Sequence, residues 1–114
     1  MSEGKMKFLF VLILVIAISV MSANAQDSTF EICKNMEAFA EQVMENRQDG
    51  VPMADMYELI MKLDVPKEAK ESMFLILKAA FKEPRFSSEE YKKKAVVDFQ
   101  NTTFLSCMEA LKDK

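Results

Sequence analysis

Apolar residues recur at intervals of three and four along most of the chain, and no segment alternates apolar and polar positions as a half-buried strand does. Such spacing places the apolar side chains of each segment on one helical face. Glycine and proline interrupt the pattern three times. The sequence therefore predicts four helices, at roughly residues 29–49, 52–63, 66–82 and 88–111.

Serine and glycine mark three of the predicted helix ends. Ser28 with Glu31, and Ser87 with Glu90, have the Ser-x-x-Glu spacing of a capping box. Gly50 suits the position just after a helix, where the backbone adopts a left-handed conformation. We therefore expect the first helix to lie between Ser28 and Gly50, and the last helix to begin after Ser87.

Three prolines mark the other helix ends. Pro52 and Pro66 are expected in the first turn of the second and third helices, where no amide hydrogen is needed. Asp64 or Val65 would then cap the third helix. Pro84 disfavours helical backbone at the residue before it and so ends that helix.

The third predicted helix contains the least polar stretch of the four. Residues Met73–Leu77 are apolar almost all the way round the helix. This pattern is typical of a helix that is covered on several sides. We therefore expect the third helix to be the most buried element.

The only two cysteines, Cys33 and Cys107, lie near the two ends of the helical region. In an antiparallel arrangement of the first and fourth helices these positions meet. Two cysteines in a small exported domain usually form a structural disulfide. A redox or metal-binding thiol and pairing between molecules are the alternatives, but the close spacing of a redox motif is absent. We predict an all-α fold, a small bundle of about four helices linked by Cys33–Cys107.

The beginning of the chain resembles a cleavable signal peptide. Two lysines precede the unbroken apolar run Phe8–Ile18, and the small-x-small pattern Ala23-Asn24-Ala25 follows it. The run is too short for a lasting transmembrane anchor. We predict that residues 1–25 are removed and that 26–114 form a single domain in the periplasm or outside the cell, with no stable membrane anchor.

The predicted mature chain is mildly acidic. Without Glu3, Lys5 and Lys7 it has 17 acidic and 13 basic residues, a formal charge of −4. This balance argues against nucleic acid or anionic lipid as the main partner. The charge is uneven, with −6 over residues 26–64 and +2 over 65–114. The two halves either attract each other within the domain or form two faces of opposite sign.

Histidine is absent, which removes the most common catalytic base and an important metal ligand. Without it no Ser-His or Cys-His catalytic pair can form. The neighbouring acids Glu89 and Glu90 are interpreted as charges that complement a helix N-terminus. We predict no enzymatic activity, no catalytic residues, no cofactor and no metal.

The mature chain is rich in methionine. In helical stripes methionine is usually a core residue, although it also lines adaptable binding grooves, and its thioether binds Cu(I). Core packing is our main interpretation, with a hydrophobic groove and a copper site as alternatives. Met53 and Met56 share a helix face as a copper pair would. The seven residues are Met36, Met44, Met53, Met56, Met61, Met73 and Met108.

One candidate interaction surface combines two turns. Arg47 and Gly50 end the first predicted helix, and Pro84, Arg85 and Phe86 connect the third to the fourth. An up-down bundle places these turns at the same end. Two arginines beside an exposed phenylalanine form a typical recognition surface. Capping and turn formation explain the same residues as an alternative.

A pattern spread over the mature chain supports export. It resembles a group of small, uncharacterised proteins with signal peptides from Gram-negative bacteria and their phages or prophages. The resemblance implies paired cysteines and a helical fold, and it implies no activity. The matching residues are Cys33, Arg47-x-x-Gly50-Val51, Pro84-Arg85-Phe86-Ser87, Tyr91, Ala95, Asp98-Phe99-x-Asn101 and Cys107.

These observations predict a non-enzymatic periplasmic or secreted protein that binds another envelope protein, through the helix-end surface or a Met-rich groove. Inhibition of an enzyme or a phage-related function fits this mode. The alternative is an acid-stress holdase, because the chain is also similar to short periplasmic chaperones with one disulfide. Neutralised carboxylates at low pH would leave unbalanced positive charge and loosen the bundle. A Cu(I) carrier is the third hypothesis, and the pattern specifies no oligomeric state.

Overall fold

The computed structural model describes residues 28–112. The predicted signal peptide, residues 1–25, and its cleavage site lie outside them. The chain divides into two compact units, Met1–Glu31 and Ile32–Lys114. Only residues 28–31 of the first unit are described, and they are helical. The second unit contains the helical bundle.

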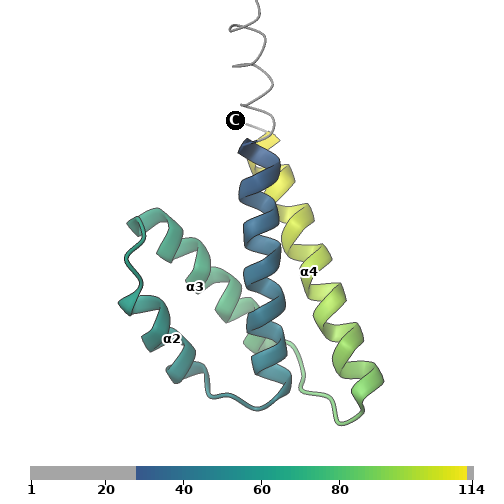
Figure 1. The fold of residues 1–114 in the computed structure, drawn as a ribbon. Coiled ribbons are helices and arrows are strands. Elements are labelled where there is room, and N and C mark those ends of the chain that lie inside the picture. The colour runs from purple at the N-terminus through teal and green to yellow at the C-terminus, as the bar shows by residue number, and fades with distance from the viewer. Residues whose placement is uncertain (1–27, 113–114) are drawn as a thin grey trace, which may run out of the picture. The chain divides into compact units, whose positions relative to one another are not determined.

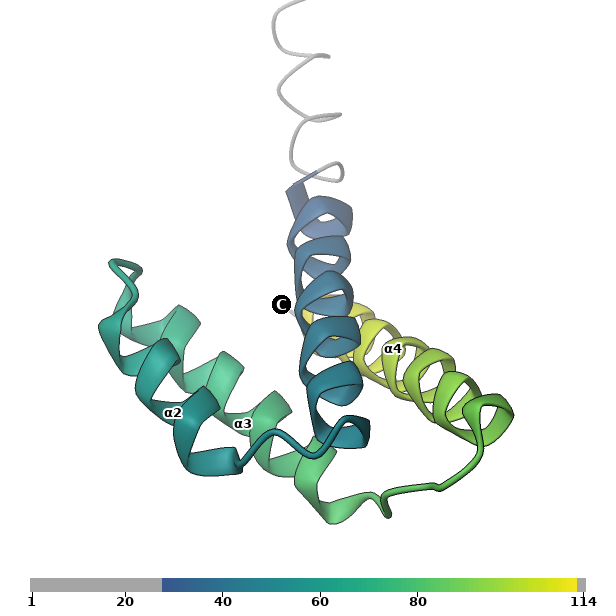
Figure 2. The same ribbon diagram turned by 60° about the horizontal axis from the view of Figure 1, so that its bottom comes forward.

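Four helices and no strands make up the described residues. The N-terminal helix is described from 28 to 48, and α2 (Met53–Lys62), α3 (Lys67–Lys82) and α4 (Glu89–Lys112) follow. Within the second unit, α2 and α3 form a hairpin on one side of the N-terminal helix, and α4 lies on the other (Figure 1). A second view also places α2 and α3 side by side (Figure 2). The predicted all-α bundle is confirmed.

Gly50 follows the end of the N-terminal helix in a left-handed conformation, as the sequence predicts. Gly50 has a φ of 86°, which side chains of L-residues rarely allow. The Val51 amide donates to the Asn46 carbonyl at 2.9 Å, and the Gly50 amide donates to the Arg47 carbonyl at 3.2 Å. These two bonds form a Schellman motif, which satisfies carbonyl groups that the helix leaves unpaired.

Both helix-starting prolines lie one position earlier than predicted. Pro52 and Pro66 are the N-caps of α2 and α3, with extended ψ angles of 142° and 151°. The proline ring fixes φ only, so the same residue suits the cap and the first turn equally well. The prediction that Asp64 or Val65 caps α3 is therefore wrong.

Neither predicted capping box forms. Ser88, not Ser87, caps α4, because its Oγ accepts a hydrogen bond from the Tyr91 amide at 3.2 Å. With this cap, the two glutamates that follow lie in the first turn of α4, where their charge complements the helix dipole. Ser28 is already helical, so it is not an N-cap.

The core lies where the N-terminal helix meets the other three helices. The expectation that α3 is the most buried element is wrong, since Leu75 is 67% exposed. The N-terminal helix is more buried because it lies between the α2–α3 hairpin and α4 (Figure 1). The buried apolar cluster consists of Ala40, Val43, Met44, Met56, Ile60, Ile76, Leu77, Ala80 and Phe99.

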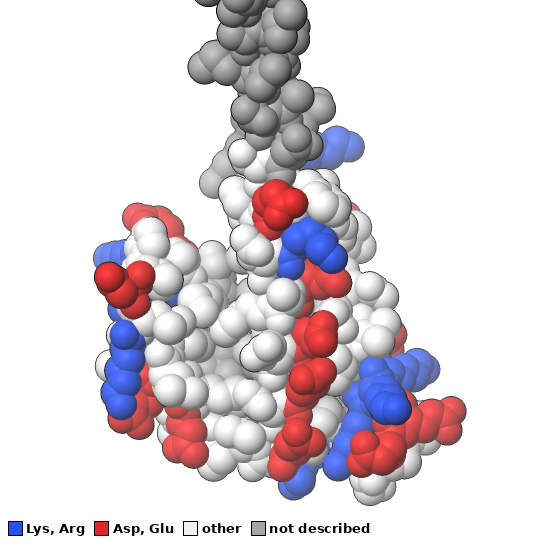
Figure 3. Space-filling view, viewed as in Figure 1, with Lys and Arg blue, Asp and Glu red and all other residues white. Residues whose placement is uncertain are grey.

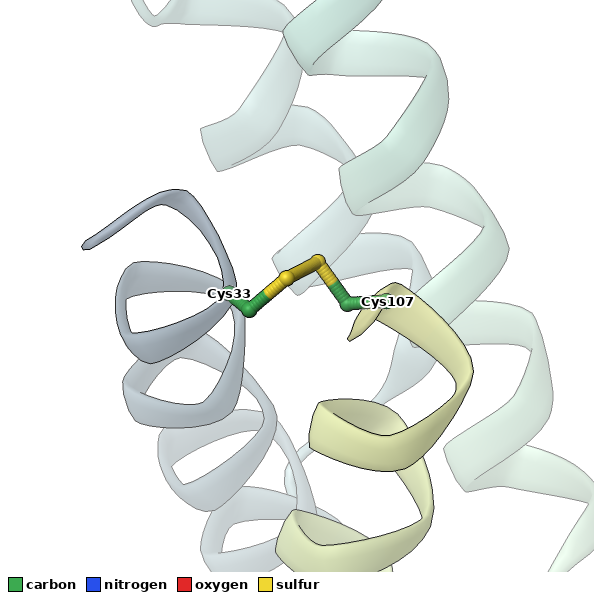
Figure 4. The surroundings of a disulfide bond; sticks show 2 residues. All are labelled: Cys33 and Cys107. Atoms are coloured by element: carbon green, nitrogen blue, oxygen red, sulfur yellow. A yellow bond between two sulfur atoms is a disulfide. The ribbon is translucent and has the colours of Figure 1, made fainter. Parts of the chain in front are cut away.

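The predicted disulfide links the N-terminal helix to α4. The Cα atoms of Cys33 and Cys107 are 5.5 Å apart, and the bond crosses directly between the two helices (Figure 4). Cys33 is 0% and Cys107 8% exposed, so solvent hardly reaches the bond. A buried disulfide is compatible with an oxidising compartment. Within residues 28–112 no helix has the length and hydropathy of a transmembrane span.

Candidate functional site

The structure brings the five residues of the predicted interaction surface to one end of the bundle. Arg47 and Gly50 lie at the end of the N-terminal helix, and hydrogen bonds connect this end to the α3–α4 loop, residues 83–88. Phe86 is half-buried and its ring centroid lies 6.0 Å from that of Tyr91. The prediction that the two turns meet is confirmed, whereas Phe86 is less exposed than expected.

Gln48 holds the loop against the helix, a role that the sequence did not reveal. Its side chain is buried, and its Nε2 donates to the Pro84 carbonyl at 2.9 Å. Its Oε1 accepts from the Phe86 amide at 2.8 Å. One signal was present: Gln48 follows Met44 by four residues on the inward-facing stripe, where a polar residue needs partners.

Both arginines of the predicted surface contact the protein itself. Arg47 donates from Nε and Nη2 to the Glu83 carbonyl at 3.3 and 3.2 Å, and its guanidinium lies 4.8 Å from the centroid of the Phe81 ring. Arg85 donates from Nε to the Gln48 carbonyl at 3.0 Å. These contacts favour the structural interpretation of both residues. Their part in recognition stays a prediction.

Gly50 is required for space as well as for its backbone angle. A Cβ atom at this position would lie 2.7 Å from Nη2 and 2.9 Å from Cζ of Arg85. The Arg85 guanidinium therefore covers the bare backbone of Gly50. This close approach couples the two residues that the sequence pattern had singled out separately.

An aromatic pocket of about 320 Å³ opens between the α3–α4 loop and α4. Phe86 and Tyr91 form one wall, and the buried ring of Phe99 lies deeper. The pocket combines aromatic rings with charged groups of both signs. We call it the aromatic pocket; its lining residues are Glu83, Phe86, Tyr91, Lys94, Ala95, Asp98, Phe99 and Thr102.

A second hollow, of about 410 Å³, separates the N-terminal helix from the first half of α3. It is visible as an uncharged recess between the two helices (Figure 3). A groove of about 340 Å³ between α3 and α4 shares Met36, Ser72 and Ile76 with it. We call the first hollow the apolar cleft; its lining residues are Ile32, Asn35, Met36, Phe39, Glu68, Ala69, Ser72, Met73 and Ile76.

Four of the seven methionines of the mature chain lie in the core or line the apolar cleft, whereas Met61 is 56% exposed. Met44 and Met56 are buried in the core, and Met36 and Met73 line the cleft. Met53 packs against the same core as Met56, so this pair has a packing role. The described residues contain no group of three or more histidine, cysteine, aspartate or glutamate side chains that could hold a metal.

No ion pair joins the acidic and the basic half of the chain within the described residues, although such attraction was one of the two predicted arrangements. Each of the three salt bridges in this part of the chain lies within one helix. The N-terminal helix and α4 are instead joined by Gln100, which donates to Glu41 at 2.8 Å and to Glu37 at 3.4 Å. A row of acidic side chains runs down the N-terminal helix (Figure 3), and its members Glu37 and Glu41 face α4 and not the apolar cleft.

The two hollows differ in chemistry. Glu68 is the one charged residue that lines the apolar cleft, whereas the aromatic pocket has Glu83, Lys94 and Asp98. Comparisons with protein-family models, curated proteins and solved structures find no match. The cleft suits an apolar surface of another molecule, and the pocket suits a small charged ligand.

Proposed function

We propose that this chain is a non-enzymatic exported protein that binds another protein of the cell envelope through its apolar cleft. The proposal places it in the periplasm or outside the cell, among small exported proteins of Gram-negative bacteria and their phages. A buried disulfide between Cys33 and Cys107 supports an oxidising compartment. The single observation that carries the binding role is the apolar cleft.

The cleft has the size and lining of a binding site. Its volume of about 410 Å³ falls within the usual range for ligand sites, and hydrocarbon dominates its walls. Ile32 on one wall is 50% exposed, and Leu75, on the adjoining groove, is 67% exposed. A partner that covers such side chains gains about 1.5–3 kcal/mol for each one fully buried.

The occupant we propose is an amphipathic helix of the partner, with lysine or arginine beside its apolar face. A groove between two helices accepts the apolar face of a third. Glu68 lies in the wall of the cleft, and residues 26–64 have a net charge of −6. Basic flanking residues would complement this charge and speed association at low salt.

The cleft supports this role better than the helix-end surface does. Arg47 and Arg85 already donate hydrogen bonds to backbone carbonyls of the protein. A partner that recruited them would have to break these bonds first. A partner that binds the cleft breaks no such hydrogen bonds, because the exposed surface of the cleft walls is mainly hydrocarbon.

The test is photo-crosslinking in the native cell from a photoreactive residue at Ser72, inside the cleft. Lys78, exposed on the same helix and absent from the cleft wall, is the matched control position. We expect one dominant crosslinked protein from position 72 and none of it from position 78. Mass spectrometry of the crosslinked peptide then identifies the partner segment.

A synthetic peptide of that segment completes the test with the purified oxidised protein. We expect Ser72→Trp, which fills the cleft, to weaken peptide binding by at least about tenfold. Lys78→Trp should leave binding unchanged, and added salt should weaken it in the wild type. Crosslinks that reach only a second copy of this chain or lipid would overturn the proposal. Equal crosslinking of many proteins from both positions, at acid pH alone, would instead support the holdase.

A further inference from the structure

The charged groups of the aromatic pocket have no partner within the described protein. Glu83 lies on the loop side, and Lys94 and Asp98 lie one turn apart on α4. None of these three side chains makes a hydrogen bond or an ion pair within residues 28–112. Only the backbone carbonyls of Glu83 and Asp98 are engaged, by Arg47 and Thr102.

The pocket therefore presents two negative charges and one positive charge around aromatic rings. A ligand that satisfies all three has one carboxylate and two cationic groups. At about 320 Å³ the pocket is near the lower limit for ligand sites, so such a ligand is small. A free basic α-amino acid has this charge pattern and this size.

We infer that the aromatic pocket binds a free basic amino acid, with arginine the best match. In this arrangement Lys94 pairs with the ligand carboxylate, and Asp98 pairs with the α-ammonium group. Glu83 pairs with the guanidinium, which stacks on the rings of Phe86 and Tyr91. Arginine suits the site better than lysine because its planar group both stacks and forms paired hydrogen bonds with a carboxylate.

The loop wall of this pocket is held in place before any ligand arrives. Arg47 binds the Glu83 carbonyl, and Gln48 binds both the Pro84 carbonyl and the Phe86 amide. A wall fixed in this way loses little conformational freedom on binding, which favours affinity for a small ligand. This inference is independent of the apolar cleft and goes beyond the proposed partner binding.

Calorimetric titration of the purified oxidised protein with three probes tests the inference. L-arginine should bind saturably with one ligand per chain. L-citrulline keeps the shape but lacks the guanidinium charge, and agmatine lacks the carboxylate. Each should bind about five- to tenfold more weakly than arginine, since each loses one charge-assisted contact.

Variants of the charged residues assign each contact. Glu83→Gln should weaken arginine about five- to tenfold, and Glu90→Gln, an exposed acid outside the pocket, should not. Lys94→Met should weaken arginine but not agmatine, which has no carboxylate to lose. Lys93→Met, a neighbouring exposed lysine outside the pocket, is the control for that variant. Unfolding midpoints confirm that each variant is folded.

Three results would overturn the inference. These are no saturable heat with arginine at millimolar concentration, equal binding of arginine and citrulline, and equal effects of Glu83→Gln and Glu90→Gln. Backbone NMR gives a second readout that does not depend on heat. Arginine should shift the amide signals of residues 83–86 and 94–98, and shifts confined to other residues would also contradict the site.

Discussion

The contacts of Gln48 allow a stability change to be worked out from the structure. Gln48→Ala removes the bond from Nε2 to the Pro84 carbonyl, at 2.9 Å, and the bond from the Phe86 amide to Oε1, at 2.8 Å. Each is worth about 0.5–1.5 kcal/mol of net stability. Loss of the buried side-chain methylene adds about 1 kcal/mol. We expect the free energy of unfolding to fall by about 2–4 kcal/mol.

Urea unfolding followed by circular dichroism measures this change. Gln42→Ala is the matched control, because Gln42 is exposed on the same helix, and it should stay within about 0.5 kcal/mol of the wild type. Gln48→Glu separates the two bonds. Its carboxylate still accepts from the Phe86 amide but repels the Pro84 carbonyl, so the protein should again be destabilised.

Hydrogen exchange locates the effect. The Phe86 amide should exchange faster in Gln48→Ala than in the wild type, while amides in the centre of α2 should change only through global stability. If Gln48→Ala and Gln42→Ala have the same unfolding free energy, Gln48 does not hold the loop and the reasoning is refuted. An unchanged Phe86 exchange rate would lead to the same conclusion.

Two further predictions concern other links between the helices. Replacing Cys33 and Cys107 together by serine should lower the free energy of unfolding by up to about 4.5 kcal/mol. The reason is that the disulfide restricts the entropy of an unfolded loop of about 75 residues. An unchanged urea midpoint would contradict this. Gly50→Ala should cost about 1–2 kcal/mol from the positive φ alone, with a further loss from contact with Arg85. In an Arg85→Ala background the second part should disappear, which a double-mutant cycle measures as coupling.

The helices and the disulfide could be predicted because local rules determine them. Apolar spacing indicates a helix without knowledge of the neighbouring helices. The first and last predicted helices are of similar length, so an antiparallel arrangement brings Cys33 and Cys107 together. The exact ends could not be predicted in the same way. Pro52 is compatible with the N-cap position and with the first turn of α2. Ser87 and Ser88 are both suitable N-caps for α4, and the choice between them moves the start of the helix by one residue.

The two hollows depend on geometry that a periodic pattern does not contain. Met36 and Met73 belong to apolar stripes whether they are buried or line a cleft. The angle between their two helices decides whether the side chains are covered or line an open cleft. Leu75 is exposed for the same reason. The meeting of Arg47 with the α3–α4 loop followed from the up-down topology. The use of its guanidinium to hold the Glu83 carbonyl required the structure.

The position of the disulfide also affects how the protein would survive proteolysis. The turn between α2 and α3, residues 63–66, is exposed, as a protease site must be. A cut there falls inside the loop closed by Cys33 and Cys107, so both fragments remain one covalent molecule. Such a nicked protein would run as a single band until it is reduced, and both walls of the apolar cleft would stay attached to each other.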